Sequence, residues 1–208
     1  MSRKRLSALM LALAVAVAGS GCTPGSEPES VTAFDTVTTL FDKNTDFAAL
    51  HTFTVVDSVF HLVDPGQSDN ISRAYDTQVL TQIRTEMTNL GWTEIANPGP
   101  GNAPDVSLNV AATTAENIVG EYWPPYWGYY PGYPGYGWGW GYSTIYNYTT
   151  GTLLMTMLDL KHPDPGTQTV PVVWTGALNG VLEAPGTVPE RLQRGIDQAF
   201  DQSPYLGK

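Results

Sequence analysis

The chain of 208 residues contains a single cysteine, Cys22, and so cannot form a disulfide bond within itself. Motifs that identify common enzymes are also missing: there is no G-x-S-x-G or S-x-x-K motif of a serine nucleophile and no lysine-containing phosphate loop. The three histidines, His51, His61 and His162, are scattered without the spacing of a zinc site. We therefore expect no catalytic residue of these classes, no metal and no cofactor.

Basic residues are scarce. The chain has 20 acidic residues against 10 basic ones, which gives a formal charge of -10. Three of the basic residues, Arg3, Lys4 and Arg5, lie in an amino-terminal segment that we expect to be removed, and their loss takes the charge to -13. Because so acidic a protein has no general attraction to nucleic acid or to anionic lipid, we expect neither as a non-specific partner.

The apolar run near the amino terminus is too short to cross a bilayer comfortably. It occupies residues 6–18, follows the basic start, and is separated from Cys22 only by the small residues 19–21, which is the organisation of an export signal. The junction resembles the lipobox of bacterial lipoproteins, with Gly19 in the place usually held by leucine. The resemblance implies that residues 1–21 are a signal peptide and that Cys22 carries acyl chains such as palmitate. The alternative is an ordinary signal peptide, cleaved near Ala18 or Ser20, that leaves Cys22 as an incidental thiol.

Two or three acyl chains anchor a protein firmly, so we expect the membrane to be a partner through Cys22. Thr23, rather than aspartate, follows the cysteine. By resemblance to the sorting rules of Gram-negative lipoproteins, this favours the outer membrane, with the protein on its periplasmic face or at the cell surface. Residues 22–33, rich in Pro, Ser and Glu, are predicted to be the lipidated cysteine and a flexible tether. Residues 34–208 are predicted to form a single domain.

Hydrophobic patterning predicts both helices and strands in this domain. Alternating or β-branched runs predict strands over residues 36–41, 52–60, 92–95, 106–112, 144–160 and 170–182. Apolar residues at steps of three and four predict helices over residues 72–90 and 187–203. This order favours the α+β class, with an antiparallel sheet and two long helices packed on one of its faces.

No charged residue occurs between Glu121 and Asp159, and the first part of this stretch is crowded with aromatic rings. Residues 122–148 contain four of the six tryptophans and nine of the eleven tyrosines. The glycines and prolines among them exclude a continuous helix, and a membrane-spanning helix with it. We expect a long Gly/Trp/Tyr-rich loop inserted between two strands.

One part of the insertion has a strict pattern. Residues 135–142 read Gly-Tyr-Gly-Trp-Gly-Trp-Gly-Tyr, so an extended backbone would place every ring on one side, about 7 Å apart. We call these four rings the aromatic comb: Tyr136, Trp138, Trp140 and Tyr142. Such a surface is suited to stacking on an envelope glycan, to a lipid headgroup layer, or to docking on an envelope protein. The alternative is an insertion that is mobile or that folds over the domain's own sheet.

Several short motifs occur in a characteristic order along the chain: Asp46-Phe47 with Thr52-Phe53, Leu90-Gly91-Trp92, Pro104-Asp105-Val106, Tyr148, Gly151-Thr152-Leu153, Leu158-Asp159, Val173-Trp174-Thr175-Gly176 and Pro204. In this order they resemble the envelope lipoproteins grouped as domain of unknown function 4136, over about residues 36–205. The resemblance implies an exported lipoprotein with an α+β domain. It implies no catalytic residue, because no activity is established for the family.

Together these patterns predict a non-enzymatic, lipid-anchored envelope protein that serves as a binding or structural module, with the aromatic comb as its contact surface. Two alternatives stay open: a carboxylate-dependent envelope hydrolase that uses acids near Asp159, and a subunit of an envelope assembly. Two carboxylates facing each other in a cleft would favour the hydrolase. An aromatic ridge on a solid core would favour the binding module.

Overall fold

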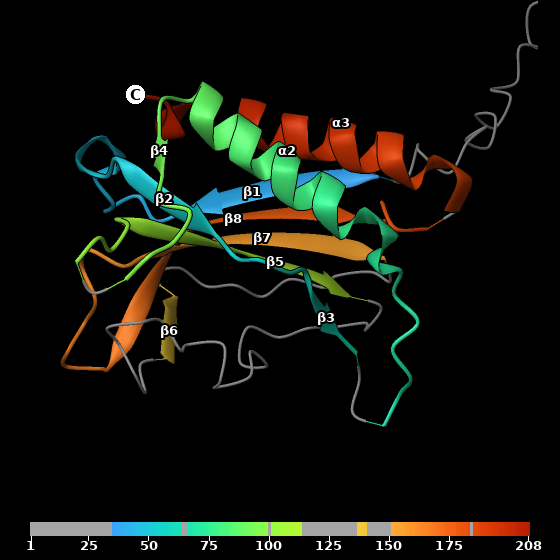
Figure 1. The fold of residues 1–208 in the computed structure, drawn as a ribbon, viewed down its shortest axis with the longest axis horizontal. Coiled ribbons are helices and arrows are strands. Elements are labelled where there is room, and N and C mark those ends of the chain that lie inside the picture. Colours follow the sequence, from blue (N-terminus) through green and yellow to red (C-terminus); the bar gives the residue numbers. More distant parts are fainter. Residues whose placement is uncertain (1–34, 64–65, 100, 114–136, 141–150, 184) are drawn as a thin grey trace, which may run out of the picture. The chain divides into compact units, whose positions relative to one another are not determined.

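In the part of the chain that the structure describes, eight strands form one sheet, and two long helices lie side by side on one of its faces (Figure 1). The computed structural model describes residues 35–63, 66–99, 101–113, 137–140, 151–183 and 185–208. The sheet order is β1-β8-β7-β5-β2-β4, with β3 also paired to β5 and β6 also paired to β8. The strands are β1 Thr36–Phe41, β2 Thr52–Val55, β3 Phe60–Leu62, β4 Thr93–Glu94, β5 Val106–Thr113, β6 Gly137–Trp140, β7 Thr152–Asp159 and β8 Thr169–Asn179.

The α+β class is confirmed, but the prediction of an antiparallel sheet is wrong, because the sheet is mixed. β7 forms a hairpin with β8 and is also antiparallel to β5, whereas β2 and β3 run parallel to β5, and β6 runs parallel to β8. Between β2 and β5 the chain passes through a helix, which carries it from the end of the sheet where β2 finishes back to the end where β2 began. The strand that follows therefore runs parallel to the strand before the helix.

Both predicted helices are present. α2, Asp76–Asn89, follows a short 3-10 turn, and α3, Val188–Asp201, follows another. Each helix contributes apolar residues to one core cluster with the sheet. α2 ends where Gly91 adopts a φ of 92°, the left-handed conformation that favours glycine at this position. No helix in the described ranges is both long enough and apolar enough to span a bilayer.

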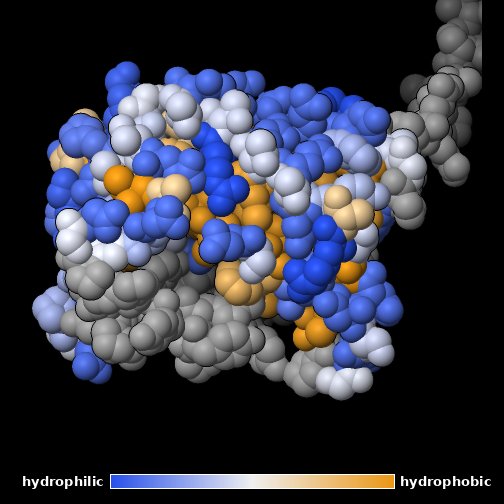
Figure 2. Space-filling view, viewed as in Figure 1, coloured by the Kyte–Doolittle hydropathy of each residue, from blue (hydrophilic) through white to orange (hydrophobic). Residues whose placement is uncertain are grey.

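A glycine brings α3 close to the sheet. A Cβ added at Gly195 would lie 2.6 Å from Cδ2 of Leu178 on β8, so only glycine fits this contact without a shift of its neighbours. The outer side of the helices is polar: Figure 2 shows hydrophilic residues over the helices and hydrophobic residues mainly below them. The helices therefore shield one face of the sheet from water.

The opposite face of the central strands is also buried. The alternation of apolar and polar residues in β5 is typical of a strand with one face in water, but all eight of its residues are buried. The same holds for all eight residues of β7. A polar residue in these strands, such as Asn109, is thus a buried group and not a solvent-facing one.

Candidate functional site

Half of the aromatic comb belongs to the sheet. Gly137–Trp140 form β6, in which Trp138 is the register partner of Val170 and Trp140 that of Val172. These four residues are extended, as the comb interpretation requires. Tyr136 and Tyr142 lie outside the described residues, as do the rings predicted elsewhere in residues 122–148. Cys22 and the rest of residues 1–33 also lie outside them.

β6 occupies a specific place at the edge of β8. β1 pairs with the carboxyl-terminal part of β8, from Trp174 to Asn179, whereas β6 pairs with the amino-terminal part, from Thr169 to Val172. Because β7 pairs with one edge of β8 from Val172 to Leu178, β1 and β6 both lie on the other edge of β8. β6 thus continues the sheet edge beyond the end of β1, with Gly139 opposite Pro171.

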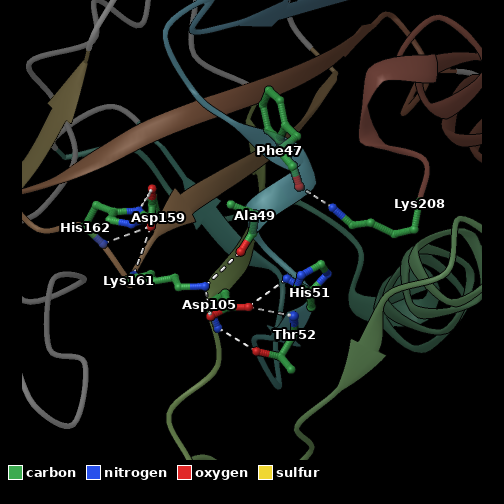
Figure 3. A network of polar contacts seen from close by, with 9 residues as sticks. All are labelled: Phe47, Ala49, His51, Thr52, Asp105, Asp159, Lys161, His162 and Lys208. Carbon is green, nitrogen blue, oxygen red and sulfur yellow. Dashed lines mark hydrogen bonds and ion pairs between the residues drawn. The ribbon is translucent and has the colours of Figure 1, made fainter.

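The second candidate is a polar network where β2, β5 and β7 come together (Figure 3). Its centre is Asp105, immediately before β5, whose carboxylate accepts hydrogen bonds from the backbone N–H of His51 at 2.7 Å and of Thr52 at 3.1 Å. The N–H of Asp105 in turn donates to Oγ1 of Thr52 at 2.8 Å. These reciprocal bonds hold the start of β2 against the start of β5.

Lys161 connects Asp105 with Asp159, the acid that the sequence singled out. Nζ of Lys161 lies 3.3 Å from the Asp105 carboxylate and donates to the carbonyl of Ala49 at 2.8 Å. The Asp159 carboxylate is buried at the end of β7 and accepts hydrogen bonds from the backbone N–H of Lys161 at 2.9 Å and of His162 at 3.0 Å. Nδ1 of His162 lies 2.9 Å from the same carboxylate. Both acids therefore have partners that fix the chain locally, which is the arrangement of structural carboxylates.

The pKa of Asp105 lies below its ordinary value. Burial by itself would raise this pKa, but the hydrogen bonds from the amides of His51 and Thr52 and the nearby ammonium of Lys161 outweigh burial. A carboxyl group with a lowered pKa in the folded state contributes its full stabilisation above the pKa of the unfolded chain, about 3.9. That contribution is lost as the pH falls through the folded-state pKa.

We expect Asp105→Asn to lower the free energy of unfolding at pH 7 by about 1–3 kcal/mol, because the charged acceptor of two backbone amides is lost. The difference from the wild type should stay constant between about pH 7 and 5 and shrink below about pH 4. Urea denaturation across this pH range measures it. Asp57→Asn, at an exposed position, is the control and should change stability by less than about 0.5 kcal/mol. An equal loss at pH 3 and pH 7 for Asp105→Asn would contradict the assignment.

The third candidate is a polar contact between His61 on β3 and Asp69. The side chain of His61 is 3% exposed, and its Nδ1 lies 2.8 Å and 3.0 Å from the two carboxylate oxygens of Asp69. The hydrogen bond from His61 lowers the pKa of Asp69, with help from the N–H of Ile71. Across the described part of the chain, no three His, Cys, Asp or Glu residues are grouped so that they could hold a metal ion.

The described residues thus define an α+β protein with a mixed sheet, two helices on one face and a Gly-Trp strand at the sheet edge. The chain belongs to the family described as Domain of unknown function (DUF4136), whose model matches residues 37–205. The family predicted from the order of the motifs is therefore confirmed.

Solved structures are similar to this fold. A DUF4136 family protein from Bacteroides thetaiotaomicron has a TM-score of 0.65 and 26% sequence identity, over 83% of this chain and 97% of that chain. A second structure, of the PelC dodecamer from Paraburkholderia phytofirmans, has a TM-score of 0.40 and 13% identity, over 84% of this chain and 98% of that chain. The comparison with curated proteins found no match.

Proposed function

We propose that this protein is a lipid-anchored, non-enzymatic module of the bacterial cell envelope that binds an envelope glycan through its aromatic comb. Cys22 carries the acyl chains, and residues 23–33 connect this anchor to the folded domain. The anchor holds the domain at the outer membrane, on its periplasmic face or at the cell surface. The lone cysteine directly after an export-signal pattern supports this part of the proposal.

The observation that carries the binding role is the pairing of Gly137–Trp140 with β8. A glycine-rich segment loses much conformational entropy when it is ordered, so a free loop would be a poor binding surface. Backbone pairing to the sheet meets part of this cost before any ligand arrives, and pre-organisation of this kind favours affinity.

A neutral glycan suits the composition of this surface. Tryptophan and tyrosine rings offer large apolar faces with polar tips, and the comb contains no charged residue. The acidic character of the chain would repel an anionic polymer but does not oppose an uncharged sugar. Among the described carboxylates, Asp105 and Asp159 are engaged with neighbouring amides, so no observation favours the hydrolase alternative.

We expect the double variant Trp138→Thr with Trp140→Thr to bind insoluble chitin, an uncharged polymer of N-acetylglucosamine, about ten-fold more weakly than the wild type, because each ring contributes about 0.5–1.5 kcal/mol of stacking. Threonine is a good strand former, so β6 is retained while the rings are removed. Co-sedimentation with insoluble chitin measures the bound fraction.

The matched control is Trp138→Phe with Trp140→Phe, which keeps two aromatic faces on the same strand. This control should retain most of the binding. Equal sedimentation of the threonine variant and the wild type would overturn the glycan proposal. Loss of sedimentation in both double variants would also overturn it, since aromatic faces would then not be the recognised feature.

A further inference from the structure

The point where the chain enters the described domain is fixed at one end of the sheet. Thr36 is the first residue of β1 and the register partner of Asn179, the last residue of β8. Asp35, just before β1, accepts a hydrogen bond from Nε of the buried Arg191 at 2.9 Å. Nη2 of Arg191 also donates to the carbonyl of Gly180 at 2.6 Å. A segment that precedes Asp35 therefore leaves the domain at the end of the sheet where β8 finishes.

β6 lies at the opposite end of β8 (Figure 1). Trp140, the last residue of β6, is the register partner of Val172. Thr36 is the partner of Asn179, seven positions further along the same strand. Since a strand rises by about 3.3 Å per residue, about 20 Å of β8 separates the two positions. The other residues of β6 pair with earlier residues of β8 and lie farther still from the entry point.

The other end of β1 lies beside β6. The N–H of Asp42, directly after β1, donates to the carbonyl of Val173 at 2.9 Å, next to the position on β8 that pairs with Trp140. Lys43 follows Asp42 and is exposed, as is Thr36 at the start of the strand. Thr36 and Lys43 are thus two exposed positions at opposite ends of one strand, the first far from β6 and the second close to it.

We propose that β6, which carries Trp138 and Trp140 of the aromatic comb, lies on the side of the domain away from the anchoring membrane, where it binds an uncharged glycan beyond the bilayer surface. This inference rests on the proposed function, both for the anchor at Cys22 and for the glycan, and adds the direction in which the ligand lies. It separates a glycan from the lipid headgroup layer, the other surface to which such rings are suited.

The direction follows from the end at which the domain is held. A body tethered near a wall cannot take orientations in which it overlaps the wall, so its far end is on average farther from the wall. A flexible tether of residues 23–33 has a mean span of about 20 Å. Because this span is no longer than the distance along β8 from the entry point to β6, the domain is not free to ignore where it is attached.

Coupling the protein to vesicles from either end of β1 tests the proposal. The chain from Cys22 to Lys208 has one thiol, so its coupling to a maleimide lipid in phosphatidylcholine vesicles imitates the native anchor. In a Cys22→Ser background, Thr36→Cys moves the attachment to the entry point, and Lys43→Cys moves it beside β6. Co-sedimentation with insoluble chitin measures the fraction of vesicles captured.

We expect vesicles coupled through Cys22 or through the Thr36→Cys variant to be captured at least about ten-fold better than those coupled through the Lys43→Cys variant, because attachment beside β6 turns this strand toward the bilayer and prevents its engagement. The three proteins before coupling are the matched controls. They should bind chitin equally, since none of the substitutions lies in β6.

Two outcomes would overturn the inference, and they can be told apart. If all three uncoupled proteins bind chitin but the Lys43→Cys vesicles are captured as well as the others, the orientation is wrong and the glycan proposal stands. If none of the uncoupled proteins binds chitin, the glycan proposal fails and this inference fails with it.

Discussion

Replacing Arg191 with alanine should lower the free energy of unfolding by about 3–5 kcal/mol, because it removes one partner of a buried ion pair. The side chain of Arg191 is 1% exposed although it lies on α3. Its Nε donates to the Asp35 carboxylate at 2.9 Å, and its Nη2 donates to the same carboxylate. Further hydrogen bonds reach the carbonyls of Gly180, at 2.6 Å, and Glu183. The hydrogen bond to Asp35 raises the pKa of Arg191, so the guanidinium stays charged.

The contacts of Arg191 with Asp35, Gly180 and Glu183 form a clamp. The clamp joins three parts of the chain: the residue before β1, the turn after β8 and the first turn of α3. Chemical denaturation at pH 7 measures the loss. Arg194→Ala is the control, because Arg194 lies on the same helix and is exposed, and it should change stability by less than about 0.5 kcal/mol. A cost below about 1 kcal/mol for Arg191→Ala would show that the clamp does not hold the fold together.

Trp174→Ala should cost a similar amount, about 3–5 kcal/mol, because it empties the largest buried side-chain site in the core. Trp174 is 0% exposed and its Nε1 donates to Oγ of Ser203 at 2.9 Å. Its ring packs beside Phe200, with 5.5 Å between the ring centroids. Gly176 leaves room for this ring, since a Cβ there would lie 2.8 Å from Cη2 of Trp174.

The effect of Trp174 can be divided into a packing part and a hydrogen-bonding part. Trp174→Phe keeps an aromatic ring but removes the donor to Ser203, so we expect a smaller cost of about 1–3 kcal/mol. Thermal and urea unfolding of both variants measure the two parts. If alanine and phenylalanine at this position cost the same, the ring volume would not be the stabilising feature.

The helices could be predicted from the sequence because their signals are local. Spacing of three and four and a stop at Gly91 are properties of neighbouring residues, and α2 and α3 appear where these patterns are. The strand expected over residues 52–60 is instead two strands, β2 and β3, which pair with different parts of β5. Such a division depends on partners far along the chain, which a local pattern does not contain.

The sequence pattern also could not predict that the sheet face opposite the helices is buried. Alternation of Asn109 with Leu108 and Val110 looks the same whether the polar side faces water or protein. The role of Asp159 could not be predicted for a related reason. The position of Asp159 in a strand could be predicted, but the amide groups that donate to it belong to a turn whose shape is set by the fold. Asp105, which Lys161 connects with Asp159, lies 53 to 54 positions along the chain from its own amide donors.

We propose that acyl chains on Cys22 anchor the protein in the envelope, and intact-mass analysis of protein extracted from membranes tests this anchor. We predict a polypeptide that begins at Cys22 and carries the added mass of a diacylglyceryl group and an amide-linked acyl chain. An unmodified polypeptide that begins before Cys22 would contradict the claim.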